Sequence, residues 1–142
     1  MPENMSPEQR REFLAHGTRH AVVATIRPDG RPHAVPVWFA LDGDDILINF
    51  GQDTVKGRNL LADPRATVVV EDPAPPFAFV SVEGVADLLS DPDEIREGSL
   101  KIAHRYLPAE QVDGWVEYAT SPGKVIARIR PTRMIGVDKV GG

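Results

Sequence analysis

HAVVATIR, at His20–Arg27, and RPHAVPVWFAL, at Arg31–Leu41, are the two stretches that decide the fold, and Pro28-Asp29-Gly30 lies between them. The first stretch is rich in β-branched residues, which favour strands. Proline presets φ and glycine accepts a positive φ, so the connecting tripeptide is typical of a turn. The two stretches are therefore predicted to form a β-hairpin.

The same pattern continues along the chain. After a turn at Asp42–Asp45, a strand at Ile46–Phe50 is expected to extend the hairpin into a three-stranded meander. Further strands are predicted at Ala66–Glu71, at Phe77–Leu89 with a bend at Gly84, at Lys124–Arg130, and, after an interruption at Pro131, at Met134–Val140.

Short helices are predicted between these strands. One begins at Ser6-Pro7 with a capping box to Gln9, and the others cover Val55–Ala62, the segment after Asp91, and Pro108–Ala119. Because hairpins rather than βαβ units connect the strands, we expect a mainly β protein, a split antiparallel β-barrel with short flanking helices. The 142 residues are expected to form one domain, residues 1–142.

The composition excludes several classes of function. The net charge of -5 argues against a protein that coats nucleic acid, and no apolar run approaches the roughly 20 residues of a membrane helix. With no cysteine, thiolate nucleophiles and iron–sulfur clusters are excluded. The polar, acidic start at Met1-Pro2-Glu3-Asn4 is unlike an export signal, so the cytoplasm is the expected location.

Common catalytic motifs are absent. The chain holds no dinucleotide-binding glycine fingerprint, no complete P-loop and no nucleophile elbow. Its four histidines do not pair at zinc spacing, so no metal site is predicted. No carboxylate pair stands out for acid–base work, and the catalytic residues are left unassigned.

The stretch Asn49–Leu60, NFGQDTVKGRNL, is the most informative one for binding. It predicts a strand end, a loop and a helix whose first turn holds Thr54, Lys56 and Arg58. Cations are unfavourable at a helix N-terminus unless an anion joins them, and a phosphate would satisfy the amides, the hydroxyl and the lysine together. The alternative is that Lys56 is an exposed lysine on a short helix.

Two other features each leave two interpretations open. Pro36 interrupts a good strand, so it marks either a protected edge or an edge that a flat ligand faces. Of Trp38 and Phe39, which point to opposite faces, one is expected in the core. The basic C-terminal strand, with Lys124, Arg128, Arg130 and Arg133, either receives an anionic tail or, as we favour slightly, balances the acidic helices.

The order of these pieces resembles the split β-barrel flavin-binding superfamily that includes pyridoxamine 5′-phosphate oxidase. It is most similar to the actinobacterial F420-dependent oxidoreductases, the flavin/deazaflavin oxidoreductase B branch. The resemblance covers about residues 10–138 and is carried by Ala24–Pro32, Val35–Phe39, Thr54–Leu60 with Asp63-Pro64-Arg65, Val82–Ala86, and Arg130–Arg133.

The resemblance implies a homodimer with two cofactor sites at the subunit interface. The flavin or deazaflavin ring would lie against Val35, Pro36, Val37 and Trp38, with Thr25 on the first strand nearby. The phosphate would lie at Thr54, Lys56, Arg58 and Asn59, while Asn49 and Phe50 would line the ring or the ribityl chain.

This chain departs from the oxidase proper. The oxidase pattern has an arginine where Val35 stands and a lysine where Ala40 stands, and its C-terminal substrate-phosphate residues are not recognisable here. We therefore expect an F420H2-dependent reductase that passes hydride to an unsaturated small-molecule acceptor, because the cofactor brings the chemistry. The alternatives are an FMN-dependent oxidoreductase and a non-catalytic F420 or flavin carrier.

Trp115 and Tyr118 either cover the pocket or, as we favour, pack in the core or interface.

Overall fold

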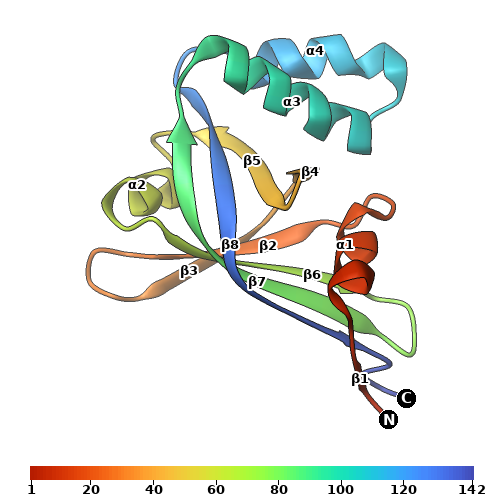
Figure 1. The fold of residues 1–142 in the computed structure, drawn as a ribbon. Coiled ribbons are helices and arrows are strands. Elements are labelled where there is room, and N and C mark those ends of the chain that lie inside the picture. Colours follow the sequence, from red (N-terminus) through yellow and green to blue (C-terminus); the bar gives the residue numbers. More distant parts are fainter.

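The computed structural model describes residues 1–142, which form four helices and eight strands (Figure 1). In chain order the elements are β1 (Glu3–Asn4), α1 (Pro7–Ala15), β2 (Ala21–Ile26), β3 (Pro32–Val37), β4 (Ala40–Asp42), β5 (Asp45–Gly51), α2 (Val55–Ala62), β6 (Arg65–Asp72), β7 (Ala78–Leu89), α3 (Pro92–Tyr106), α4 (Ala109–Ala119) and β8 (Lys124–Asp138).

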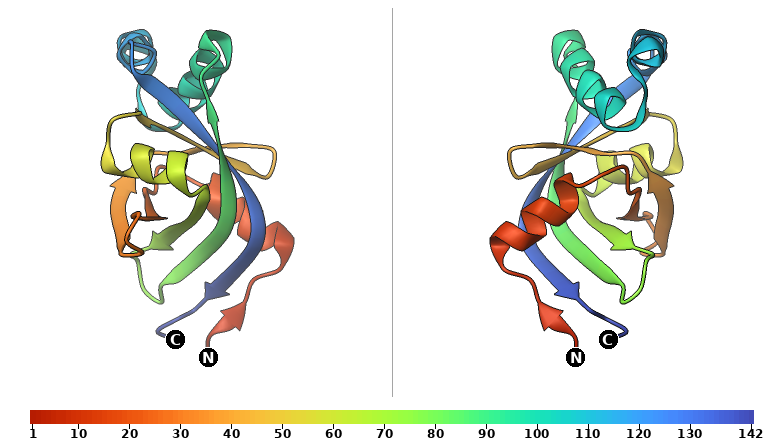
Figure 2. Two further views of the ribbon diagram at one scale, coloured as in Figure 1. Left: turned by 90° about the vertical axis from the view of Figure 1, so that its left-hand side faces the viewer. Right: turned by 90° about the vertical axis from the view of Figure 1, so that its right-hand side faces the viewer.

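All eight strands belong to one antiparallel sheet with the order β3-β2-β6-β7-β8-β5-β4, and β1 pairs with β8. The long strands β7 and β8 cross the molecule and curl the sheet into a barrel, which stays split because β3 and β4 form its two unpaired ends (Figure 2). Helices α3 and α4 lie side by side at one end of the barrel, and both chain termini lie at the other (Figure 1). The predicted mainly β, split-barrel fold is confirmed.

The predicted hairpin is β2–β3, but the predicted meander is confirmed only at Ala40–Leu41, the end of the predicted second strand, which pairs with β5 as part of β4. Strand β5 pairs with β8 and the short β4, not with β3. The predicted strand Arg31–Leu41 breaks after Val37, because Phe39 turns into the core and donates its amide to Tyr106 Oη at 3.2 Å. Phe39 is thus the core member of the Trp38–Phe39 pair, as expected.

The predicted interruption at Pro131 is also wrong, because β8 continues through it to Asp138. Proline has no amide to donate to a ladder, and the sheet accommodates it beside a register shift between Glu83 and Gly84 in β7. A Cβ on Gly84 would lie 2.6 Å from the Arg130 carbonyl oxygen, so only glycine permits this approach. The predicted bend at Gly84 is confirmed.

Helix starts follow the sequence closely. Ser6 and Gln9 form the predicted capping box, and Asp91 caps α3 by accepting the amide of Glu94. None of the four helices combines the length and the apolar character needed to cross a bilayer.

The barrel interior is filled by alternate residues of β2, β5, β6, β7 and β8, chiefly valine and isoleucine. A second apolar cluster joins α3 to the outer side of β5 and β8. Gly98 allows this close packing, because its Cβ position is 3.3 Å from the Ile126 side chain. The α3–α4 pair is thereby fixed over the end of the barrel where β3 and β5 finish.

Candidate functional site

A cleft of about 410 Å³ opens where the ends of β3 and β5, the start of α2, the last turns of α4 and the start of β8 converge. The residues that line it come from five separate parts of the chain: Pro36, Val37, Trp38, Asn49, Phe50, Gly51, Thr54, Lys56, Trp115, Tyr118 and Lys124. It is the hollow that gathers the residues expected to bind a cofactor.

One wall of the cleft is aromatic. The half-buried Trp38 stacks on Tyr106, with ring centroids 4.7 Å apart and planes 14° from parallel, and packs at 5.8 Å against Trp115. Tyr106 is itself fixed, because its hydroxyl donates to the Arg19 carbonyl at 2.9 Å and accepts from the Phe39 amide. Trp38 therefore offers the cleft a rigid apolar surface held by α3 and α4.

The start of helix α2 forms the polar end of the cleft. Thr54 is the N-cap, and its Oγ1 accepts the Gly57 amide at 3.2 Å while donating to the Gly51 carbonyl at 2.7 Å. A Cβ on Gly57 would lie 2.7 Å from the Gln52 carbonyl oxygen, so glycine is needed for the helix to begin this close to the loop. The first turn of a helix carries amides without intrahelical partners and a partial positive charge.

Two lysines add full positive charge. Neither Lys56 nor Lys124 is paired with a carboxylate. Burial, and secondarily the charge of Lys124, hold the pKa of Lys56 below its ordinary value. Lys124 Nζ donates to Tyr118 Oη at 2.9 Å, and this contact lowers the pKa of Tyr118. The cleft is thus electropositive without an internal counterion.

Asn49 connects the cleft to its surroundings. Its Nδ2 donates to the Ala119 carbonyl at 2.9 Å and to the Val125 carbonyl at 3.4 Å. Strand β5 therefore holds both the end of α4 and the start of β8, the two elements that carry Tyr118 and Lys124.

Seven of the predicted site residues line the cleft: Pro36, Val37, Trp38, Asn49, Phe50, Thr54 and Lys56. Four do not. Thr25 and Asn59 are buried and bonded to each other at 3.0 Å, which ties α2 to β2, and Val35 packs against the barrel core. Arg58 is exposed on α2, outside the cleft.

Three residues of the cleft are not among the site residues predicted from the sequence. The sequence favours core or interface packing for Trp115 and Tyr118, and Trp115 does pack there in part, but both line the cleft. The sequence groups Lys124 with the arginines of the basic C-terminal strand. The turn at Ser121-Pro122-Gly123 was the available signal, because it folds Lys124 back toward Tyr118.

The arginines of β8 are paired elsewhere. Arg128 bridges Asp42 and Asp45, and Arg130 bridges Asp87. Charge balance was therefore the better interpretation of these arginines, although their partners lie on strands rather than on the acidic helices.

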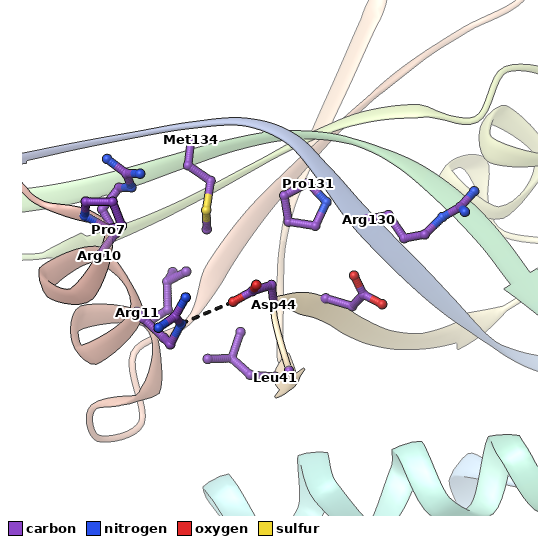
Figure 3. Close-up of a pocket in the computed structure, with 11 residues that line it drawn as sticks. Pro7, Arg10, Arg11, Leu41, Asp44, Arg130, Pro131 and Met134 are labelled. Atoms are coloured by element: carbon purple, nitrogen blue, oxygen red, sulfur yellow. Dashed lines mark hydrogen bonds and ion pairs between the residues drawn. The ribbon is translucent and has the colours of Figure 1, made fainter.

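A second hollow, of about 390 Å³, lies between α1 and the β4–β5 turn (Figure 3). Arginines surround it, but Arg11 already binds Asp44 and Arg130 binds Asp87. A third arginine, Arg10, donates to the Met5 carbonyl at 3.2 Å. Unlike the cleft, this hollow also holds carboxylates, those of Asp44 and Asp45. No group of three or more histidine, aspartate or glutamate side chains is arranged to hold a metal ion.

Comparison with known proteins identifies the family of this chain. The family model described as pyridoxamine 5′-phosphate oxidase matches residues 6–138. An F420H2-dependent biliverdin reductase of Mycobacterium tuberculosis is 27% identical over 119 residues, which are 83% of this chain and 80% of that protein.

Two solved structures are also similar. A conserved hypothetical protein of Mycobacterium tuberculosis has a TM-score of 0.79 at 27% identity, covering 92% of this chain and 82% of that one. A protein described as an F420 reductase has a TM-score of 0.65 at 29% identity, covering 87% and 94%.

Proposed function

The chain belongs to the pyridoxamine 5′-phosphate oxidase family, and from this premise we propose that it is an F420H2-dependent reductase of an unsaturated small-molecule acceptor. Similarity to an F420H2-dependent biliverdin reductase and to an F420 reductase supports a flavin or deazaflavin oxidoreductase. The choice of F420 over FMN is part of the proposal.

The main support for this proposal is the arrangement of the cleft. Two lysines without a carboxylate partner, Lys56 and Lys124, lie at the start of helix α2 beside the rigid aromatic wall formed by Trp38. Leaving the half-buried Lys56 charged and near Lys124 is unfavourable in the free protein. A phosphate would remove this cost, and helix N-termini bind phosphate through their free amides. The residues present therefore fit a cofactor with a flat ring and a phosphate-bearing tail.

The roles of the side chains follow from their places. Pro36, Val37, Trp38 and Phe50 would hold the ring and exclude water. Lys56 and the free amides at the start of α2 would hold the phosphate, while Thr54, whose hydroxyl already bonds Gly51 and Gly57, would fix the shape of that turn. When bound, a reduced deazaflavin would supply hydride to an electron-poor double bond, and the protein would bind, orient and shield the reactants.

The positions that distinguish the oxidase support this choice. Val35 packs on the barrel core and Ala40 is buried, so neither brings a charge to the cleft. The arginine and lysine of the oxidase pattern have no replacement at these two positions.

We also propose that two copies of the chain assemble through the outer face of the sheet. Residues paired across five strands form one outward row: Pro36, Val22, Val69, Ser81 and Ile135. Val22, Val69 and Ile135 remain 41%, 36% and 42% exposed, which is a cost that a second copy would remove. Pro36 lies both in this row and at the cleft, so a partner on this face would border the cofactor.

Titration of the purified protein with F420 and with FMN, followed by absorbance and fluorescence, tests the cofactor. We expect F420 to bind more tightly, and clearly tighter FMN binding would favour the FMN-dependent oxidoreductase instead. Lys56→Gln should weaken F420 binding, whereas Lys139→Gln, which removes a lysine paired with Glu3 at the chain ends, should not.

A second experiment tests the reaction. The F420H2-loaded protein is mixed with biliverdin and with a panel of quinones and enones, and oxidation of the cofactor is followed. Consumption of the cofactor by at least one acceptor is expected. A cofactor that binds but is never consumed would identify a carrier.

A further inference from the structure

We propose that Tyr118 is the proton donor of the reduction and that Lys124 is a positioning residue for its hydroxyl. This inference rests on the proposed reductase function. Hydride addition to a C=C or C=N bond requires one proton to complete the product, and its source is not specified by the cofactor.

The cleft contains few groups able to supply that proton. No carboxylate and no histidine lines it. The Thr54 hydroxyl is already engaged as the cap of α2, and Lys56 lies at the polar end proposed for the phosphate. Tyr118 and its neighbour Lys124 are the remaining groups with an ionisable proton.

The Tyr118–Lys124 contact has the polarity that an acid requires. The Lys124 ammonium donates to the phenol oxygen at 2.9 Å, so the O–H of Tyr118 is left free to donate elsewhere. The ammonium also lies 4.3 Å from the centre of the Tyr118 ring. This positive charge stabilises the phenolate that proton transfer leaves behind, and it makes the phenol a stronger acid than a free tyrosine.

Tyr118 is also accessible and anchored. Its residue is 58% exposed, so an acceptor entering the cleft can reach it. The neighbouring Ala119 carbonyl is fixed to β5 by Asn49. Lys124 is fixed at the first residue of β8, where it pairs with Gly51.

The step balances without a further reagent. Bound F420H2 would supply two electrons and one hydrogen as hydride, and the oxidised deazaflavin would release its remaining proton to water. The O–H bond of Tyr118 breaks, a C–H or N–H bond forms on the acceptor, and the phenolate regains a proton from water.

A spectroscopic titration tests the pair without cofactor. The chain has two tyrosines, Tyr106 and Tyr118, so tyrosinate absorbance against pH is readily assigned. We expect one transition below the ordinary tyrosine range, its loss in Tyr118→Phe, and its upward shift in Lys124→Gln. Lys56 also faces Lys124, so Lys56→Gln is titrated in parallel to separate its charge from that of Lys124.

Kinetics with F420H2 and the best acceptor of the panel test the catalytic role. General acids contribute about 100-fold or more, so Tyr118→Phe should lower kcat by roughly that factor while the KM and the F420 affinity stay close to wild type. Lys124→Gln should shift the pH profile of kcat. Lys139→Gln is the control and should leave all of these unchanged.

Several outcomes would overturn the inference. Wild-type kcat in Tyr118→Phe, or a tyrosinate titration unmoved by Lys124→Gln, would reject it while leaving the reductase function intact. A wild-type protein that binds no F420, or binds it and reduces no acceptor, would reject the reductase function and this inference together.

Discussion

Asn49 on β5 donates its Nδ2 to the carbonyl of Ala119 at 2.9 Å and so fixes the C-terminal end of helix α4 to the barrel. The same amide reaches the Val125 carbonyl at 3.4 Å on the neighbouring strand. The sequence resemblance predicts that Asn49 lines the cofactor ring or the ribityl chain. Its side chain lies in the cleft, but the bonds that it makes serve the protein itself.

Asn49→Ala should therefore cost stability as well as ligand affinity. Loss of these bonds should lower the free energy of unfolding by about 1–2 kcal/mol, because a half-buried carbonyl loses its donor. Urea denaturation measures the change. Asn4→Ala, at an exposed asparagine of β1, is the control and should stay within about 0.5 kcal/mol of wild type. Equal losses in the two variants would contradict the anchoring role.

Gly57→Ala tests the close start of helix α2. Its Cβ would meet the carbonyl oxygens of Gln52 and Gly51 at 2.7 and 2.9 Å, so the loop must move. We expect a loss of about 1–3 kcal/mol in unfolding free energy and weaker F420 binding, because the amides of the first turn shift with the loop.

Gly114→Ala is the matched control for that variant. Gly114 lies in α4 with nothing within 4 Å of its Cβ position. Alanine is the better helix former, so a gain of about 0.5–1 kcal/mol is expected. If both variants were stabilised, the proposed clash at Gly57 would be wrong.

Local chemistry in the sequence was sufficient for much of the fold. Ser6 with Gln9, Asp91 and Thr54 cap helices as their residue types predict, and the Pro28-Asp29-Gly30 turn closes the first hairpin. These features depend on neighbours within a few residues. The phosphate-site prediction had the same origin, because it needed only the order of strand, loop and helix.

The pairing of strands that are distant in the chain could not be predicted from local sequence in the same way. Nothing local distinguishes β3 from β8 as the partner of β5, and the choice depends on Phe39 entering the core after Val37. The sequence predicts a strand end at Pro131, because the sheet accommodates this proline only beside Gly84, which lies far away in the sequence. The Tyr118–Lys124 contact likewise depends on how the turn after α4 is held.

The Arg128–Asp42 bridge predicts a pH-dependent contribution to stability. Arg128 holds the pKa of the Asp42 carboxyl below its ordinary value. A carboxyl with a depressed folded-state pKa stabilises the fold above its unfolded pKa, about 3.9, and loses this contribution as pH falls through the folded value. Because the pair is partly exposed, Asp42→Asn should cost only about 0.5–1 kcal/mol at neutral pH.

Chemical denaturation of Asp42→Asn and wild type at several pH values measures this contribution. The two stabilities should converge as the solution is made more acidic than about pH 4. Asp44→Asn removes a more exposed bridge to Arg11, and we expect a smaller effect at every pH. If the difference in unfolding free energy between Asp42→Asn and wild type grew larger in acid, the prediction would be wrong.

Charges on the outer face should prevent the proposed dimer. Val22→Lys with Val69→Lys places two like charges side by side in the row that would meet a second copy. Light scattering should show a dimer for wild type and a monomer for the double variant. Val55→Lys, at a valine of α2 that is 44% exposed, is the control and should stay dimeric. A monomeric wild type would refute the assembly.

The affinity for F420 should depend on pH because the Lys56 side chain must carry a proton to attract the phosphate. An anion stabilises the ammonium form, so binding raises the pKa of Lys56, which burial and Lys124 depress in the free protein. F420 affinity should therefore be full below the free-protein pKa of Lys56 and should fall as pH rises through it, with added salt weakening it further. Fluorescence titration of the protein with F420 from neutral to alkaline pH measures this decline in affinity.

Lys56→Gln should weaken binding about 10-fold or more at neutral pH and flatten the alkaline decline, because the loss of one charged hydrogen bond costs about 1.5–3 kcal/mol. An alkaline decline of the same size in Lys56→Gln would move the titrating group to Tyr118 or Lys124, the other ionisable residues of the cleft.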